Sequence, residues 1–269
     1  MAPPRGGAER VASHGIIEAM TTVLNPIFTP PMQLVAALRD HGQAVLAPAG
    51  LIELIQAPTN ALNALRAEWT TLPPDAYLRD GGRYRRRRHA SFVVDGERVT
   101  PVPHRAHWQP VDYNALHGGL ERWFEPMRPA VTRQAVWTQL LCALSGVCSA
   151  LKGAQPWYVE AHQFRIDTTD GIGRPTPEGA HRDGVDFVAV LLVERSGIKG
   201  GETRVFEADG PAGQRFTMIE PWTTLLLDDA RVVHESTPIQ PDPPSAVAGH
   251  RDTLVLTFRR GGFQQALAA

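Results

Sequence analysis

The sequence predicts an α+β fold in which a helix-rich N-terminal half supports a β-barrel or β-sandwich in the C-terminal half. Two observations predict it. Segments rich in alanine and leucine occupy much of the chain before Gly153. After that residue, short apolar runs alternate with clusters of Gly, Pro and Asp. Many short strands separated by turns are typical of a sandwich or a barrel.

The first elements of the N-terminal half are delimited by turn residues. Residues 1–14 are predicted to form a disordered tail. Residues 31–40 (PMQLVAALRD) suit a helix, and His41-Gly42 provides its stop signal. A short strand is then expected at 43–46.

Two further helical regions are expected before the strands begin. Residues 51–68, rich in alanine and leucine, contain a helix, whereas 71–82 contain prolines and glycines and form a loop. A long helical stretch is expected from about 113 to 151, broken near Pro126 and Pro129, because proline interrupts a helix.

The C-terminal half is predicted to consist mainly of strands. The expected strands are 157–167 (WYVEAHQFRID), 185–194 (VDFVAVLLVE), 202–207, 214–219, 223–227, 231–234 and 252–259. No internal repeat or low-complexity linker separates the two halves. A single domain is therefore expected over 15–269, with a helix-rich part at 15–152 and a β core at 153–262.

The composition excludes several classes of function. The formal net charge of -1 gives no global field that would recruit nucleic acid or an anionic membrane. The first twenty residues lack the apolar run of a secretory signal, and no run of about 18 apolar residues predicts a membrane span. Cys142 and Cys148 are expected on different faces of a helix, so we do not expect a disulfide between them. We therefore expect a reducing, cytoplasmic compartment.

Three residues form a candidate metal site. His181 and Asp183 are two apart in an extended segment, so an imidazole and a carboxylate point to the same side. His234 follows the apolar run that ends at Leu227. Two histidines and one carboxylate leave coordination positions open, which is the arrangement that non-haem Fe(II) oxygenases use to bind a cosubstrate and O₂.

A third segment supplies a candidate anion site. Arg251 opens the last predicted strand, and Thr253 lies on the same face. A guanidinium binds a carboxylate through two parallel hydrogen bonds, and a hydroxyl adds another. This chemistry suits the far carboxylate of 2-oxoglutarate. Arg259 is a rival anchor, but it lies about 26 Å further along the strand, so only one of the two can serve the same pocket.

These segments resemble the 2-oxoglutarate/Fe(II)-dependent dioxygenases, and more narrowly the L-isoleucine dioxygenase-like bacterial family that hydroxylates free L-amino acids. The N-terminal half matches more loosely, through the arginine-rich strand at 84–89. The matching motifs are HQFRI at 162–166, PEGAHRDGVDF at 177–187, GGET at 200–203, DDARVVHESTPI at 228–239 and GHRDTLVLTFRR at 249–260.

The resemblance implies a double-stranded β-helix, the jelly-roll or cupin-like barrel, with iron between its two sheets. It implies Fe(II) ligands at His181, Asp183 and His234, with 2-oxoglutarate bound at Arg251 and helped by Thr253. The implied reaction uses O₂ to convert 2-oxoglutarate to succinate and CO₂ while one oxygen atom enters a C–H bond of the substrate. Related halogenases lack the metal carboxylate, so the presence of Asp183 favours hydroxylation.

Candidate substrate-binding residues lie in two segments. Gln163 and Arg165 share one side of their strand, so Arg165 could bind a substrate carboxylate, or it could form a structural pair with Asp167 or Glu160. Glu178 could accept hydrogen bonds from a substrate ammonium group, or it could be a solvated loop carboxylate.

The arginine run at 85–88 has three interpretations. On a strand, Arg85 and Arg87 share one side with His89, and the two other arginines share the opposite side. The run could be a solvated face, a lining of the substrate pocket or a nucleic-acid patch. The net charge of -1 argues against the last interpretation.

Other polar residues are expected outside the metal site. His104, His107 and His117 lack ligand spacing and are expected to be structural. Asp186 points to the opposite face from Asp183.

Three functions therefore compete. The first is a 2-oxoglutarate-dependent hydroxylase of a free L-amino acid or a close derivative. The second is a cupin-type metal enzyme without 2-oxoglutarate, and the third is a nucleic-acid or protein-binding module that uses the arginine run. The first implies a small-molecule substrate, with no nucleic-acid or membrane partner. The sequence leaves open which amino acid is the substrate, whether it is free or part of a peptide, and whether a carbon or a sulfur atom is oxidised. It also leaves the oligomeric state open, with a homodimer among the options.

Overall fold

The computed structural model describes residues 24–114, 116, 118–242 and 248–266. The predicted tail at 1–14 and His117 lie outside these residues. The helices are η1 Pro31–Gln33, α1 Leu34–His41, α2 Pro48–Ile55, α3 Thr59–Asn63, η2 Arg66–Thr71, α4 Pro129–Thr132 and α5 Ala135–Lys152. The strands are β1 Gln43–Leu46, β2 Arg85–Asp95, β3 Arg98–Pro101, β4 Trp157–Asp167, β5 Phe187–Ser196, β6 Ile198–Gly200, β7 Thr203–Glu207, β8 Gly213–Phe216, β9 Thr224–Asp228, β10 Val232–Ser236, β11 Ile239–Pro241 and β12 His250–Arg259.

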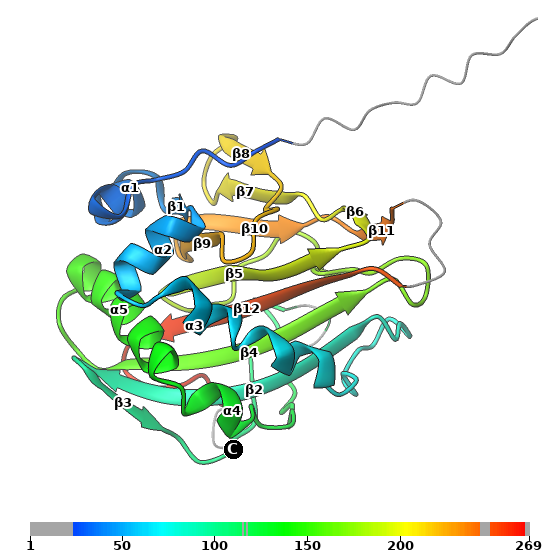
Figure 1. The fold of residues 1–269 in the computed structure, drawn as a ribbon, viewed down its shortest axis with the longest axis horizontal. Helices are drawn as coiled ribbons and strands as arrows, with labels where there is room; N and C mark the ends of the chain where they lie inside the picture. The colour runs from blue at the N-terminus through cyan, green and yellow to red at the C-terminus, as the bar shows by residue number, and fades with distance from the viewer. Residues whose placement is uncertain (1–23, 115, 117, 243–247, 267–269) are drawn as a thin grey trace, which may run out of the picture.

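The strands form one large sheet and two small ones, an arrangement consistent with a double-stranded β-helix (Figure 1). The large sheet has the order β1-β9-β5-β12-β4-β2-β3, and all of its neighbouring strands are antiparallel. The smaller sheets are β10-β7-β8 and β11-β6. The predicted fold class is therefore confirmed.

Several boundaries agree with the sequence prediction. Helix α1 ends at Gly42, whose φ of 70° is left-handed and whose N–H donates to the carbonyl of Leu38 at 2.9 Å. Strands β1 and β4 have the predicted limits. The short strands β3, β6 and β11 had no separate signal because three or four residues are too few to show a period.

The helix predicted from 113 is wrong over its first part, because in the described portion of this stretch helical structure begins only at Pro129. The end of the irregular segment before Pro129 forms backbone hydrogen bonds with β2. The N–H of His89 donates to the carbonyl of Glu125, and the N–H of Met127 donates to that of His89, at 3.0 and 3.1 Å. A distant strand thus provides hydrogen bonds that the sequence prediction assigned to a helix.

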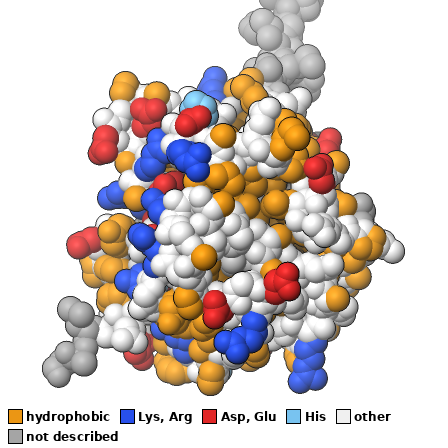
Figure 2. Space-filling model, turned by 90° about the vertical axis from the view of Figure 1, so that its left-hand side faces the viewer, with side chains coloured by type: hydrophobic (Ala, Val, Ile, Leu, Met, Phe, Trp, Pro, Cys, Tyr) orange, Lys and Arg blue, Asp and Glu red, His pale blue; other side chains and the backbone are white. Residues whose placement is uncertain are grey.

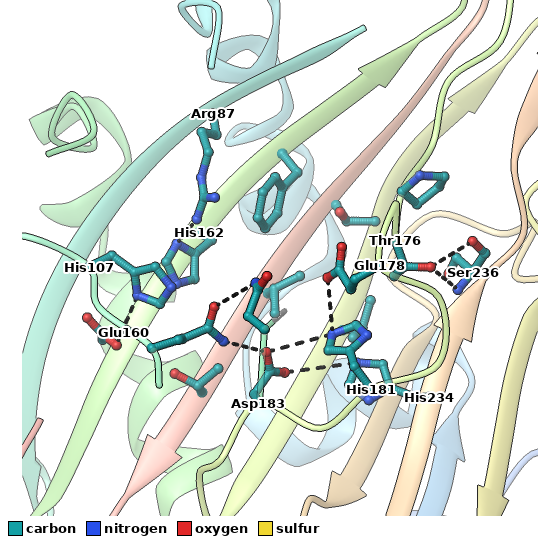
Figure 3. Close-up of a pocket in the computed structure, with 18 of the residues that line it drawn as sticks. Arg87, His107, Glu160, His162, Thr176, Glu178, His181, Asp183, His234 and Ser236 are labelled. Atoms are coloured by element: carbon teal, nitrogen blue, oxygen red, sulfur yellow. Dashed lines mark hydrogen bonds and ion pairs between the residues drawn. The ribbon is translucent and has the colours of Figure 1, made fainter. Parts of the chain in front are cut away.

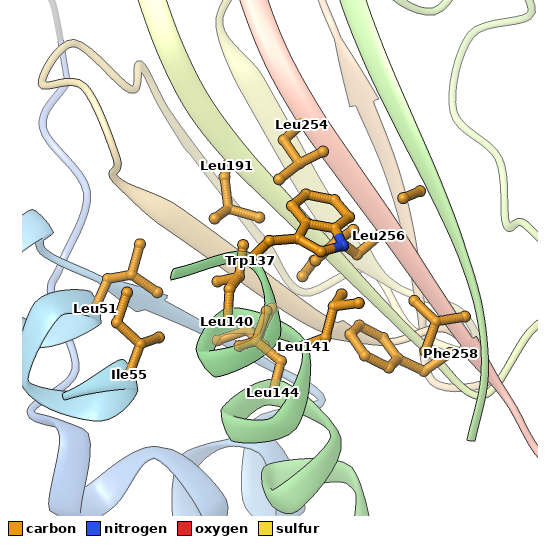
Figure 4. Packing of buried hydrophobic residues seen from close by; sticks show 14 of the residues in the cluster. Leu51, Ile55, Trp137, Leu140, Leu141, Leu144, Leu191, Leu254, Leu256 and Phe258 are labelled. Carbon is orange, nitrogen blue, oxygen red and sulfur yellow. The ribbon is translucent and has the colours of Figure 1, made fainter. Parts of the chain in front are cut away.

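Helix α5 packs against the outer face of the large sheet (Figure 4). Its Trp137 and leucines meet Leu254, Leu256 and Phe258, which are the even-numbered residues of β12. By length and composition alone, α5 could cross a membrane, but its apolar face belongs to this core. Packing of the even positions leaves the odd positions of β12 to face the other way.

Trp137 is the residue whose truncation we expect to destabilise this core most. Its side chain is fully buried between α5 and the sheet. Trp137→Ala should lower the free energy of unfolding by about 3–5 kcal/mol, through lost burial and the cavity left behind. Urea denaturation measures this. Trp123→Ala, at a side chain that is 52% exposed, should change it by less than about 1 kcal/mol, and equal effects would contradict the packing described.

Candidate metal centre and substrate pocket

A pocket lies between the inner face of the large sheet and strand β10 (Figure 3). Strand β12 contributes its odd-numbered residues from Arg251 to Thr257, and β4 contributes its even-numbered residues from Glu160 to Ile166. His234 and Ser236 enter from β10. The alternation of side chains along each strand therefore decides which residues reach the pocket.

His181, Asp183 and His234 meet on one side of this pocket (Figure 3). The Nε2 atoms of both histidines lie 3.9 Å from carboxylate oxygens of Asp183. The backbones of His181 and His234 pair directly, through N–H···O bonds of 3.1 and 3.0 Å. Their potential ligand atoms all lie within 4.8 Å of one another, so the three predicted residues could hold one metal ion.

Neighbouring groups orient these side chains for ligation. The Nδ1 atom of His181 lies 3.0 Å from the carbonyl of Gly179. That carbonyl can only accept, so Nδ1 carries the proton in the neutral ring and Nε2 is the atom that offers a lone pair to a metal. Gln109 donates from its amide nitrogen to Asp183 Oδ1 at 3.0 Å. The arrangement is a ligand set with supporting hydrogen bonds.

The two histidines have opposite pKa shifts. Burial, together with the nearby His181, lowers the pKa of His234 to about 4. Burial also disfavours charge on His181, but the carboxylates of Asp183 and Glu178 outweigh it and raise its pKa. His234 is therefore neutral at physiological pH, as a ligand must be.

Asp229 fixes the turn that carries the metal carboxylate. It accepts backbone N–H bonds from Asp183, Gly184 and Val185 at 3.0, 2.8 and 3.1 Å. Asp229→Asn replaces one accepting oxygen by an amide that cannot accept. We expect Fe(II) affinity to fall by about 10–100-fold, measured by anaerobic Fe(II) titration. Asp228→Asn is the matched control because Asp228 pairs with Lys152 and does not line the pocket. Equal losses in both variants would argue against this role.

Arg251 is a buried cation that faces the pocket with an unused donor. Its Nη2 has no hydrogen-bond partner within the described residues. Burial and the neighbouring Arg195 lower the pKa of Arg251 to about 10, so it stays charged at neutral pH. Thr253 is buried on the same face. Arg259 instead donates to the carbonyl of Gly262 at 2.6 Å and does not line this pocket. The geometry therefore favours Arg251 as the anchor for a carboxylate.

The arginine run divides between the two sides of β2. Arg85 and Arg87 are buried and line the pocket. Of the other two, Arg86 lies 3.5 Å from Asp167 and Arg88 lies 2.8 Å from Glu125. The run is thus not a solvated face. Lys and Arg side chains do gather along the left side of the face in Figure 2, with Asp and Glu beside them, but Arg85, Arg87 and Arg88 are buried. This removes the feature on which the nucleic-acid interpretation depended.

Gln163 and Arg165 do not reach the pocket, so their predicted substrate role is wrong. Pocket-lining residues of β4 are even-numbered, and these two are odd-numbered. Arg165 donates to both carboxylate oxygens of Asp252 at 2.7 and 2.6 Å, instead of pairing with Asp167 or Glu160. The alternation predicted that the pair shares a face, but not which face is internal.

Glu178 lines the pocket, so it is placed where the first of its two interpretations requires. Its Oε1 lies 3.6 Å from Nε2 of His181, and its Oε2 is buried without a hydrogen-bond partner in the described chain. An unsatisfied buried carboxylate oxygen is a binding site for an N–H donor.

A buried histidine cluster surrounds Glu160 beside the pocket. His107 and His89 lie 3.2 Å from its two carboxylate oxygens, and His162 stacks on His89. Together the three imidazoles could also hold a metal ion, but Arg87 donates to His162 Nδ1 at 2.8 Å and opposes a cation there. The cluster is therefore best described as neutral histidines that hold Glu160. The expected structural role of His107 fits this, although the residue also lines the pocket.

This cluster makes the stability of the fold depend on pH. Burial, opposed by Glu160, lowers the pKa of His107 to about 4 and also lowers that of His89. A histidine whose pKa is lower in the folded than in the unfolded protein takes up a proton more readily in the unfolded chain, where its pKa is about 6.5. The stability that the neutral ring contributes above that pH is therefore lost as the pH falls. We expect the free energy of unfolding in urea to decrease from pH 6.5 to 4.5. His107→Gln should flatten this slope, whereas His104→Gln should not. An unchanged slope in the first variant would contradict the assignment.

The sequence did not predict three of the polar residues at this site. Gln109 lies just before the segment that was expected to be helical and Arg122 lies within it, and no pattern distinguished either residue. Asp229 had a signal, because it follows the apolar strand β9 and is an acidic residue in a buried setting.

Comparison with known proteins identifies relatives over most of the chain. A family model described as 2OG-Fe dioxygenase matches residues 66–257. No curated protein matches the chain. The crystal structure of a bsmA homolog from Methylobium petroleophilum PM1 is 52% identical, covers 90% of this chain and 97% of its own, and has a TM-score of 0.85.

Two more distant structures share the fold. IDO from Bacillus thuringiensis is 16% identical over 90% of this chain and 100% of its own, with a TM-score of 0.70. The Fe(II)/(alpha)ketoglutarate-dependent dioxygenase TqaL is 19% identical over 86% of this chain and 87% of its own, with a TM-score of 0.66.

Proposed function

Because this chain belongs to the 2OG-Fe dioxygenase family, we propose that it hydroxylates a free L-amino acid or a close derivative. The family uses Fe(II), 2-oxoglutarate and O₂. What we propose is the class of substrate and the residues that bind Fe(II), 2-oxoglutarate and the substrate.

The residues of the pocket fit the iron and the cosubstrate. His181, Asp183 and His234 would hold Fe(II), and Arg251 with Thr253 would bind the far carboxylate of 2-oxoglutarate. The unused buried donor of Arg251 supports this fit. Bound iron would supply the activation of O₂, one atom of which enters the substrate and the other succinate, with release of CO₂. The protein orients both substrates and shields the pocket from water.

One observation supports an amino acid as the substrate. The pocket offers a buried carboxylate oxygen on Glu178 and buried guanidinium donors on Arg85 and Arg87, all without hydrogen-bond partners among the described atoms. An α-amino acid carries an ammonium and a carboxylate, which complement these two kinds of group. A neutral hydrocarbon substrate would leave both kinds unsatisfied.

Succinate release from Fe(II), 2-oxoglutarate and a panel of L-amino acids tests the proposal. We expect at least one amino acid to stimulate succinate formation and to gain one oxygen in the mass spectrum. The product's structure distinguishes carbon hydroxylation from sulfur oxidation. If no amino acid stimulates turnover above the rate with 2-oxoglutarate alone, the proposed substrate class is wrong.

A further inference from the structure

The pocket contains a second cationic site, formed by Arg85, Arg87 and Arg122, which we name the arginine wall. Their exposed fractions are 6%, 4% and 2%, and all three line the pocket that contains the metal triad. None of them has an assigned partner in the proposed binding of iron or 2-oxoglutarate.

The arginine wall is separate from Arg251. Ile166 on β4 pairs with Arg251 on one side and with Arg85 on the other. The two arginines thus start about 10 Å apart, two strand spacings. Arg85 also leans toward the far edge of β2, because its Nε lies 2.7 Å from Asp75, which pairs with that edge. A carboxylate held by Arg251 therefore leaves the arginine wall available to another anion.

The arginine wall has more positive than negative charge. Asp75 is its one carboxylate partner among the described residues, at 2.7 Å from Arg85 and 3.8 Å from Arg87. Arg122 donates to the neutral amide oxygen of Gln109 at 2.8 Å. Within ion-pair distance, three guanidinium groups thus meet one carboxylate, and two positive charges have no carboxylate in contact within the described chain. Glu178 acts on Arg122 without an ion-pair contact, and in the proposed function it pairs with an ammonium group.

The other buried carboxylate nearby does not balance these charges. Glu160 is already paired with Arg105 at 2.8 Å and lies against His89 and His107. Both histidines are buried and neutral at physiological pH, so they add no charge, and the Arg105–Glu160 pair is balanced by itself. The two positive charges of the arginine wall therefore face the pocket.

The arginine wall is also pre-organised for binding. The guanidinium of Arg87 lies between the rings of Phe124 and Phe164, at 3.7 and 4.4 Å from their centroids, and is tied to His162. Stacking on aromatic rings holds a guanidinium in one plane, with its edge free for an anion. Buried donors remain without hydrogen-bond partners in the described chain at Arg85 Nη2, Arg87 Nε and Arg122 Nε.

We propose that the substrate is an L-amino acid with a second acidic group, a carboxylate or a phosphate ester, whose two anionic groups bind the arginine wall while its ammonium binds Glu178. This inference rests on the proposed function and narrows it. A neutral amino acid would cancel only one of the two positive charges and leave buried donors unsatisfied. An amino acid with two acidic groups cancels both.

Matched pairs of amino acids test this with the full chain, Fe(II) and 2-oxoglutarate. The pairs are L-glutamate with L-glutamine and L-aspartate with L-asparagine, alongside L-2-aminoadipate, O-phospho-L-serine and L-leucine. We expect kcat/KM for an acidic member to exceed that of its amide by at least about tenfold, because the lost contact is a buried charge pair. Comparing kcat/KM for O-phospho-L-serine with that for the dicarboxylic amino acids shows whether the second acidic group is a phosphate or a carboxylate. Thermal shifts under anaerobic conditions give a second readout that needs no turnover.

A variant and its control assign the preference to the arginine wall. Arg122→Gln removes a guanidinium without leaving a carboxylate unpaired, and it should reduce the acid-over-amide preference by at least about tenfold. Arg86→Gln, on the other side of β2 and paired with Asp167, should keep the preference.

The outcomes separate this inference from the proposed function. Turnover with L-leucine or the amides equal to or above that with the acidic amino acids would overturn the second acidic group but keep the amino acid. Succinate formed from 2-oxoglutarate alone, with stimulation by no amino acid, would overturn both. A preference that survives in Arg122→Gln would assign it to other residues and overturn the role of the arginine wall.

Discussion

His181→Ala should reduce Fe(II)-dependent succinate formation to the level of metal-free protein. His181 supplies one of the three candidate ligands, and its backbone already pairs with that of His234. Truncation therefore removes a ligand atom while the strand pairing that places the other histidine can persist. With two ligands left, the affinity for Fe(II) should collapse, and oxidation of any substrate depends on that ion.

A binding measurement and a control distinguish ligand loss from misfolding. Anaerobic Fe(II) titration should show loss of the site, while circular dichroism and urea denaturation should show a folded protein. His250→Ala is the matched control, because His250 lies on β12 outside the pocket beside Glu194. Substantial turnover that survives in His181→Ala would show that the ion is held elsewhere.

Arg251→Ala should raise the 2-oxoglutarate concentration needed for half-maximal turnover by roughly 30- to 4,000-fold. Removing one partner of a buried, hydrogen-bonded charge pair costs about 2–5 kcal/mol, and each 1.4 kcal/mol changes affinity about tenfold. Fe(II) affinity should change far less, because Arg251 is not a candidate ligand. Initial rates of succinate formation over a range of 2-oxoglutarate concentrations measure the effect.

Two further variants make this result specific. Arg251→Lys keeps the charge but loses the two-pronged geometry, so its 2-oxoglutarate requirement should lie between those of the parent protein and Arg251→Ala. Arg259→Ala removes the rival arginine of the same strand, which donates to Gly262 away from the pocket, and should leave the requirement unchanged. An unchanged requirement in Arg251→Ala would favour a metal enzyme that does not use 2-oxoglutarate.

Much of the metal site could be predicted because its geometry is local. His181 and Asp183 are two residues apart, and an extended backbone places both on one side without help from distant residues. The same reasoning linked Arg251 to Thr253. The irregular segment before Pro129 could not be predicted in this way, because the backbones of Glu125 and Met127 bond to His89 of β2, far away in the sequence, and that of Arg122 bonds to His107.

The sequence by itself determined which side chains share a face within each strand. It could not determine which face is internal, since β4 carries polar residues on both: Gln163 and Arg165 on one, Glu160 and His162 on the other. Only the tertiary structure decided, because α5 buries its apolar face against one side of the sheet and leaves the opposite side to form the pocket. Burying that apolar surface removes it from water, and this fixes the arginines, histidines and carboxylates of the other face around one site.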